Sequence, residues 1–366
     1  MTEKELSSAS INLLRPCLLL LVVFNHCTMS LDNIMGGGCN SLICRYIQVF
    51  LGMTLTPAAV STFFVISGYL YFANVASLNK DTYFYKTRKR IWTLVIPYFL
   101  WNLAGVITMF LLRYFIGSPL GFDTFGGFLR QFWCSNVWNE NTVNLLGQHT
   151  PLYAPIDWPL WYLRDLIVVS FLSPAIYWAV KKLKYFYFII LAPLYLLNVW
   201  TIIPGLGLSS FIFFGLGVYL AIYKGSLNIT ENKCYKIFIL ISAIFTASTS
   251  AYLWLVQGVT TFNYSIYTLA TILLVAAMLI IGRMASVGGL QVNRMFVESS
   301  FFVYAFHDFT GINPITLVKK IVRVLQVESS ILIYLLTPFI VYGISVVVYY
   351  IINRFMPRFT HLITGR

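Results

Sequence analysis

Long apolar runs separated by short polar segments dominate this chain. About ten of these runs are long enough to cross the roughly 30 Å hydrocarbon layer of a membrane as helices. They lie near residues 12–30, 50–73, 91–115, 159–180, 185–203, 206–223, 237–256, 264–282, 299–322 and 331–353. The pattern predicts an all-α polytopic membrane protein with about ten transmembrane helices, forming a single domain over residues 1–366 without internal repeats.

The polar segments between the runs predict the topology. Lysine and arginine are abundant in alternate loops, such as residues 80–90 and 181–184, and scarce in the loops between them. Cytoplasmic loops are enriched in these cations, so the pattern predicts that both termini are cytoplasmic. The first run lacks a cleavage site, so it is expected to be a retained span that follows a short cytoplasmic tail, residues 1–10. A long loop near residues 116–157 is then extracytoplasmic.

Composition supports the membrane class. The chain is 59% hydrophobic and 10% charged, whereas soluble proteins carry about 25% charged residues. A net charge of +13 would suggest nucleic-acid binding in a soluble protein, but here the cations fix topology and no nucleic-acid partner is expected. The six cysteines show no metal-ligand spacing, so no metal is expected. Cys39 and Cys44 are predicted to share an outer loop, where they are either bridged or free thiols.

The first span carries an arginine and a histidine that need an explanation. Eleven positions separate Arg15 from His26, which on an α-helix leaves about 20° beyond three full turns and a rise of about 16.5 Å. Both side chains therefore share one face, about half a membrane core apart. Separately, Arg15 could contact lipid phosphates and His26 could be a buried polar residue; together they favour a shared pocket. Pro16 suits a first helical turn, so Arg15 is expected just before the regular helix.

Two further clusters follow along the chain, and the arginines of the second lie on the same inner surface as Arg15 in this topology. Ser67 and Gly68 interrupt an apolar run, which indicates either a local break facing protein or water or close helix packing. Lys86, Arg88, Lys89 and Arg90 directly precede the third span. Such cations commonly set topology, but arginine also suits phosphate binding, so Arg88 and Arg90 could join Arg15 in binding an anionic cofactor.

Other polar residues lie in or beside later spans, where ionisable groups are costly and often functional. Trp161, Arg164 and Asp165 lie at the outer entrance of the fourth span, where the arginine and aspartate could pair. Glu298 lies near the inner start of the ninth span, and His307 and Asp308 lie within it. Each could instead be an interhelical polar contact. Aromatic residues of the long loop are candidates for stacking on sugar rings or for anchoring at the interface: Trp133, Trp138, Tyr153 and Trp158.

In order along the chain, these stretches resemble the integral-membrane acyltransferase 3 family. The matching features are an arginine and a histidine with ten residues between them, FFVISGY, an R-x-R pair before the third span, PLWYL, FFGLGVYLA and a late SSFFVYAFH. The resemblance covers nearly all of the chain. It is closest to compact O-acetyltransferases similar to the enterobacterial common antigen O-acetyltransferases.

The resemblance implies an activity and a set of residues. The expected protein is a multi-pass inner-membrane enzyme that moves an acyl group, acetyl above all, from cytoplasmic acyl-CoA to a hydroxyl of a surface glycan or its lipid-linked precursor. By this resemblance, Arg15, Arg88 and Arg90 are expected to bind acyl-CoA, and His26 is expected to be the catalytic residue. Ser67, Gly68, Trp161, Glu298 and His307 are supporting candidates.

The chemistry leaves two routes open. An alcohol needs a base to attack a thioester, and a neutral imidazole, with an ordinary pKa near 6.5, suits that role. Histidine could equally act as a nucleophile that carries the acyl group. Two other classes stay open as well: a transporter or flippase of a glycan or small polar solute, in which buried ionisable groups relay protons, and an assembly factor without a site. Transporters often contain inverted repeats, which are not apparent here.

Overall fold

The computed structural model describes the chain except residues 1, 32–41, 76, 118–123, 136–141, 146–147, 152, 201–202, 230–233, 257–259, 311–313 and 326–328. Side chains are also left undescribed at residues 28–31, 142–145, 148–151, 319, 323 and 330. Cys39 and Trp138 lie outside the described residues, and so does the predicted alternative of a Cys39–Cys44 bridge.

Six helical segments among the described residues are long and apolar enough to cross a membrane. Three of these spans are single helices from the second half of the chain: α12 (Tyr235–Val256), α13 (Thr261–Val287) and α16 (Ser330–Phe355). A fourth is α1 (Glu3–Leu31). The other two are composite: α2 (Leu42–Gln48) continues through η1 (Val49–Leu55) into α3 (Thr56–Phe72), and α4 (Lys80–Arg90) through η2 (Ile91–Val95) into α5 (Ile96–Ile116). The membrane class is thus supported by length and composition.

The remaining predicted spans are shorter or broken. After the short η3 (Trp158–Leu160), α8 (Trp161–Phe171) and α9 (Ser173–Leu183) are bent by 67° and make at most a seventh span. The fifth and sixth predicted spans correspond to α10 (Phe186–Leu196) and to α11 (Leu208–Tyr219) with η4 (Leu220–Lys224). The ninth corresponds to α14 (Arg294–Phe306), with α15 (Pro314–Val324) following beyond residues 311–313. Ten spans and cytoplasmic termini therefore stay predictions.

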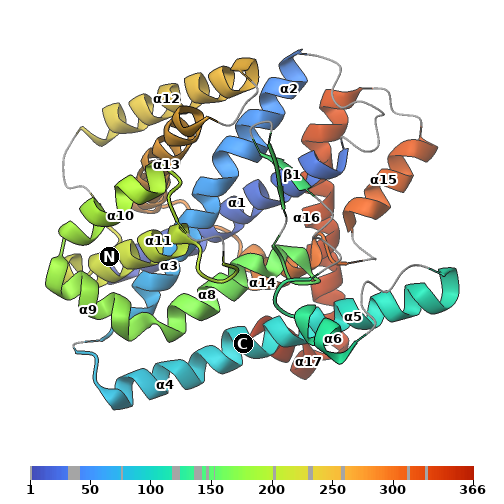
Figure 1. The fold of residues 1–366 in the computed structure, drawn as a ribbon, viewed down its shortest axis with the longest axis horizontal. Helices are drawn as coiled ribbons and strands as arrows, with labels where there is room; N and C mark the ends of the chain where they lie inside the picture. Colours follow the sequence, from blue (N-terminus) through green and yellow to red (C-terminus); the bar gives the residue numbers. More distant parts are fainter. Residues whose placement is uncertain are drawn as a thin grey trace.

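The described structure is helical apart from one hairpin. Strands β1 (Thr142–Leu145) and β2 (Gln148–Pro151) pair antiparallel, with Thr142 opposite Pro151, within the predicted long loop. The same loop contains the short helix α6 (Phe125–Arg130). A last helix, α17 (Pro357–Thr364), packs against α5 near the C-terminus (Figure 1).

Proline coincides with a widened turn in two of the long spans and not in a third. The wide π-helical turns η1 and η2 lie immediately before Pro57 and Pro97, where a proline ring displaces the carbonyl one turn earlier and a widened turn accommodates it. Helix α1 instead continues through Pro16. The prediction that Arg15 lies just before the regular helix is therefore wrong, because α1 begins twelve residues earlier, at Glu3.

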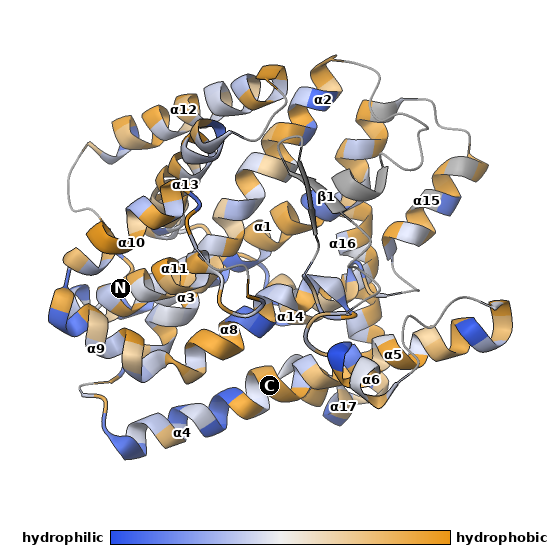
Figure 2. Ribbon diagram, in the orientation of Figure 1, coloured by the Kyte–Doolittle hydropathy of each residue, from blue (hydrophilic) through white to orange (hydrophobic). Residues whose placement is uncertain are grey.

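Polarity is distributed unevenly over the helices. Figure 2 shows α4 as a hydrophilic segment that leads directly into the apolar helix α5. The last turn of α4 carries Arg88, Lys89 and Arg90. This abrupt change in polarity within one continuous helix is typical of a segment that enters a membrane from its surface.

Helices α3 and α11 pack with their backbones in close approach at two glycines. A Cβ atom on Gly68 would lie 2.2 Å from the Phe214 carbonyl oxygen, and one on Gly217 would lie 2.1 Å from the Val65 oxygen. Small residues allow such approaches between membrane helices. Helix α3 is continuous through Ser67 and Gly68. Of the two alternatives for this pair, close packing is therefore confirmed and a local break is wrong.

We expect Gly68→Ala to destabilise the protein by about 1–3 kcal/mol, because overpacking at a backbone contact forces the two helices apart. Thermal unfolding of the purified protein in detergent measures the change. Gly343→Ala in α16 is the matched control, since a Cβ atom there meets nothing within 4 Å. Equal unfolding midpoints for the two variants would contradict the packing account.

Candidate active site

A cavity of about 570 Å³ lies between α1, α3, α4, α8, α14 and the C-terminal residues. The lining positions follow helical spacing on each element. Helix α1 contributes Arg15, Leu19, Val22, Asn25 and His26, and the α4–η2 segment contributes Lys86, Lys89, Arg90, Thr93 and Leu94. Positions i, i+3, i+4 and i+7 share one helix face, so a single face of each helix faces the cavity. The predicted common face of Arg15 and His26 is confirmed.

One part of the cavity is strongly cationic. Five of its lining residues are arginine or lysine, namely Arg15, Lys86, Lys89, Arg90 and Arg366, and among the described residues that line it none is acidic. Arg90 donates a hydrogen bond from Nη2 to the Ser67 carbonyl oxygen at 3.3 Å. Its guanidinium lies over the Tyr71 ring, 5.4 Å from the centroid. Both partners orient the cation without neutralising it, which leaves the cavity suited to an anion.

His26 lines the same cavity and is 5% exposed. Its Nδ1 atom lies 2.9 Å from Oδ2 of Asp308, the residue that follows α14 by two positions. A carboxylate at Nδ1 selects the tautomer of the neutral imidazole that carries its proton on that nitrogen and its free lone pair on Nε2. The arrangement therefore gives His26 a ring nitrogen that can act as a base or a nucleophile.

Trp158 completes this cluster. Its Nε1 lies 2.6 Å from Asp308 Oδ2 and 3.0 Å from His26 Nδ1, but an indole has a single N–H to donate. The carboxylate oxygen is the closer and the charged acceptor, so both the indole and the imidazole donate to it. The two rings meet edge to face with centroids 4.8 Å apart. Trp158 thus positions both members of the His26–Asp308 pair.

His307 packs on His26 from another side, with ring centroids 4.6 Å apart. It is fully buried, and its Nδ1 lies 3.1 Å from the Val303 carbonyl oxygen, one turn earlier in α14. This contact holds a proton on Nδ1 and fixes the orientation of the His307 ring. His307 does not line the cavity, so the structure places it as a support for the His26 ring.

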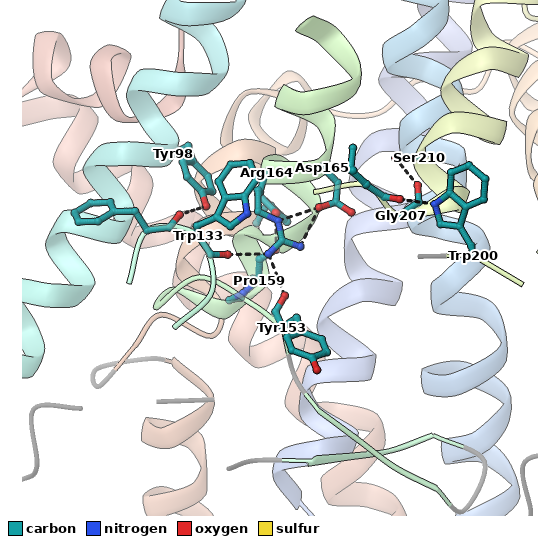
Figure 3. Close-up of polar contacts among 12 residues, drawn as sticks. Tyr98, Trp133, Tyr153, Pro159, Arg164, Asp165, Trp200, Gly207 and Ser210 are labelled. Atoms are coloured by element: carbon teal, nitrogen blue, oxygen red, sulfur yellow. Dashed lines mark hydrogen bonds and ion pairs between the residues drawn. The ribbon is translucent and has the colours of Figure 1, made fainter. Parts of the chain in front are cut away.

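A buried ion pair anchors the loop that carries Trp158. Arg164 in α8 pairs with Asp165, with Nη2 and Oδ1 2.9 Å apart, which confirms the predicted pairing. Arg164 also donates from Nη1 to the carbonyl oxygens of Trp133 and Tyr153, at 2.8 and 3.0 Å. Figure 3 shows these bonds converging on the guanidinium from separate segments of the loop. Because both ions are at most 4% exposed, loss of either partner leaves a buried charge.

The backbone before Trp158 is fixed as well. The Ile156 amide donates to the Gln131 carbonyl oxygen at 2.8 Å, and the Thr310 hydroxyl donates to the Ile156 carbonyl oxygen at 2.5 Å. Thr310 lies two residues after Asp308. The segment that presents Trp158 and the segment that presents Asp308 are therefore bonded to each other, which sets the distance between the two side chains.

The structure brings some of the sequence-predicted residues to the cavity and leaves others outside it. Arg15, His26, Ser67, Arg90 and Trp161 line it, whereas Arg88, Gly68, Glu298 and His307 do not. Arg88 is exposed, because two positions along an α-helix turn a side chain by about 200°. Glu298 pairs with exposed Arg294 one turn away, at 2.5 Å.

The sequence did not predict the roles that four residues have in this site. Asp308 was noted as an intramembrane acid and Trp158 as a loop aromatic, but their contact with His26 depends on tertiary structure. Lys89 was noted only within a cationic cluster. Arg366 carries no motif, and no pattern in the sequence indicates it. Among the described residues, no group of three or more His, Cys, Asp or Glu side chains is placed to hold a metal ion.

Comparison with known proteins identifies the family. A sequence model described as an acyltransferase domain matches residues 8–354. The chain belongs to this acyltransferase family. Membership confirms the resemblance found in the motifs and supports a membrane acyltransferase over a transporter or an assembly factor. No solved structure matches the chain.

A curated relative of this acyltransferase is the succinoglycan biosynthesis protein ExoH of Rhizobium meliloti (strain 1021). The two are 27% identical over 237 residues, which covers 62% of this chain and 57% of the relative. This chain therefore spans little more than half of that protein's length.

We expect Asp308→Asn to lower the rate of acyl transfer by roughly 10²-fold or more, since an amide can present its NH₂ to Nδ1 and select the wrong imidazole tautomer. Initial rates with saturating acyl donor measure the effect. Asp81→Asn, at an exposed position in the first turn of α4, is the control. A rate for Asp308→Asn equal to that of the control would contradict the assigned pairing.

Proposed function

We propose that this protein is a membrane O-acyltransferase that moves an acetyl group from cytoplasmic acetyl-CoA to a hydroxyl of a cell-surface glycan or its lipid-linked precursor. The observation that carries the proposal is one cavity whose described lining residues include five cations, no acidic residue, and His26, which is paired with Asp308. Family membership supports the acyl-transfer class.

The donor follows from the charge of the cavity. Coenzyme A carries a diphosphate and a further phosphate at one end and its thioester at the other. Arg15 and Arg90 present planar guanidinium groups that suit phosphate oxygens. Along α1, about 16.5 Å separates Arg15 from His26, a distance that an extended pantetheine arm can cover. The phosphates then lie among the cations while the thioester reaches the imidazole.

The proposed reaction is direct transfer with His26 as general base. The Nε2 lone pair takes the proton of the acceptor hydroxyl as its oxygen attacks the thioester carbonyl. The carbon–sulfur bond breaks, the electron pair leaves on the sulfur of coenzyme A, and the proton on Nε2 passes to that thiolate. Asp308 stabilises the imidazolium that forms between these steps.

The route with an acyl-histidine uses the same nitrogen. It differs in one observable: incubation with labelled acetyl-CoA and no acceptor would leave label covalently bound to the protein. Direct transfer leaves none. Rapid acid quenching followed by separation of protein from donor distinguishes the two.

The acceptor class rests on the relative, whose name places it in the biosynthesis of a polysaccharide, succinoglycan. Trp133 and Tyr153, which are partly exposed in the loop that leads to Trp158, are candidates for sugar stacking. In the proposed orientation the protein lies in the inner membrane with both termini in the cytoplasm, so the cationic part of the cavity meets the cytoplasmic donor and the glycan approaches from the opposite side.

We expect His26→Ala to reduce transfer of labelled acetyl from acetyl-CoA to background in isolated membranes, with expression unchanged, because the base is removed. His361→Ala, at an exposed position in α17, should behave like the wild type. Normal turnover by His26→Ala would refute the proposed catalytic role. Glycan movement that requires no acyl donor would instead favour transport.

The R-x-R pair offers an internal comparison. We expect Arg90→Gln to raise the KM for acetyl-CoA about tenfold or more, because it removes a charge-assisted contact inside the cavity. Arg88→Gln should have a much smaller effect, since Arg88 is exposed and faces away from the cavity. Steady-state kinetics on purified protein measure both. A larger effect at Arg88 than at Arg90 would show that the donor binds elsewhere.

A further inference from the structure

The last residues of the chain form part of the cavity wall, although the family match ends at residue 354. Thr364, Gly365 and Arg366 line the cavity beside Arg15 and Arg90. Thr364 is the last residue of helix α17, and Gly365 and Arg366 follow it. Helix α17 packs on α5 and on the end of α16 (Figure 1). This chain therefore adds a wall to the cationic part of the cavity from outside the matched region.

Two contacts fix these residues in place. The buried Trp101 side chain in α5 donates from Nε1 to the Ile363 carbonyl oxygen at 2.9 Å. Gly365 adopts a left-handed conformation with φ 68°, and a Cβ atom there would lie 2.3 Å from the Thr93 carbonyl oxygen. A glycine is thus required on both conformational and steric grounds. The sharp turn that it makes directs the next residue, Arg366, to the cavity.

Arg366 has spare hydrogen-bonding capacity there. The structure gives its guanidinium two hydrogen bonds, from Nη1 to the Tyr349 hydroxyl at 3.2 Å and from Nη2 to the Val297 carbonyl oxygen at 3.4 Å. Both acceptors are neutral, and a guanidinium has five N–H donors. Arg366 is also close enough to Arg15 for their charges to repel. Among the described lining residues none is acidic, so a bound anion would offset this repulsion.

We propose that Arg366 is a donor-binding residue whose guanidinium binds a phosphate of acyl-CoA at the cavity mouth, and that α17 and Gly365 position it. The inference rests on the proposed function. Arg366 and Lys89 are exposed, whereas Arg15, Lys86 and Arg90 are partly buried, so the first two mark the mouth. A donor whose thioester reaches His26 directs its nucleotide end to that mouth. Arg366 then acts on donor affinity and not on the chemical step.

The test compares Arg366→Gln with the wild type and with Arg358→Gln, an exposed arginine of α17 that does not line the cavity. Initial rates are measured on purified protein with acetyl-CoA and with S-acetylpantetheine, which carries no phosphate. We expect Arg366→Gln to raise the KM for acetyl-CoA about tenfold with kcat unchanged, since a charge-assisted hydrogen bond is lost. Rates with S-acetylpantetheine should stay at the wild-type value, and Arg358→Gln should match the wild type with both donors.

A second variant retains the Arg366 guanidinium but shifts its position. Gly365→Ala clashes with the Thr93 backbone, so it should raise the KM for acetyl-CoA in the same direction while Arg366 is present. An unchanged KM for acetyl-CoA in Arg366→Gln would overturn the inference. An equal loss with both donors would also overturn it, because a merely structural role of α17 predicts that result.

Direct binding of labelled coenzyme A separates this inference from the proposed function. A wild-type protein that binds coenzyme A about tenfold more tightly than Arg366→Gln, yet transfers no acetyl group, would retain the binding role of Arg366 and refute the enzyme activity. If the wild-type protein transfers acetyl groups but Arg366→Gln binds coenzyme A as tightly as the wild type, the enzyme activity is retained and the binding role of Arg366 is refuted. Absence of both binding and transfer would overturn both.

Discussion

The rigid spacing of Arg15 and His26 along helix α1 is the constraint on which the site depends. An α-helix rises about 1.5 Å per residue, so a cation and an imidazole eleven positions apart on one face are held about 16.5 Å apart. Other elements of the fold lie around each of these two residues. Helices α3, α4 and the C-terminal residues surround Arg15, while Trp158 and Asp308 meet His26. A substrate that spans the two ends must be long and must carry its negative charge away from its reactive group.

The cluster around His26 depends on long-range contacts. Asp308 follows α14, and Trp158 follows a loop anchored by the buried pair of Arg164 and Asp165. Hydrogen bonds between that loop and Thr310 join the two segments. Orientation of the imidazole thus requires three regions of the chain to fold together, which couples the site to the extracytoplasmic loop of the proposed topology.

Local periodicity predicted much of the site, whereas contacts between distant segments could not be predicted from it. The common face of Arg15 and His26 follows from helix geometry alone, and the same geometry explains why Arg90 lines the cavity while Arg88 does not. Apolarity indicated the membrane class but not helix length, because the runs at 159–180 and 299–322 are broken by a bend after Phe171 and by the end of α14 at Phe306. Asp308 and Arg366 reach the cavity region only through tertiary packing, for which a single sequence carries no signal.

The most direct test of the central claim, a cavity whose two ends have separate roles, is the affinity of labelled coenzyme A for purified protein with one end altered at a time. The account predicts that His26→Ala binds coenzyme A as tightly as the wild type, because His26 contacts the thioester end, and that Arg15→Gln binds it about tenfold more weakly or worse. Loss of binding in His26→Ala together with wild-type affinity in Arg15→Gln would contradict it.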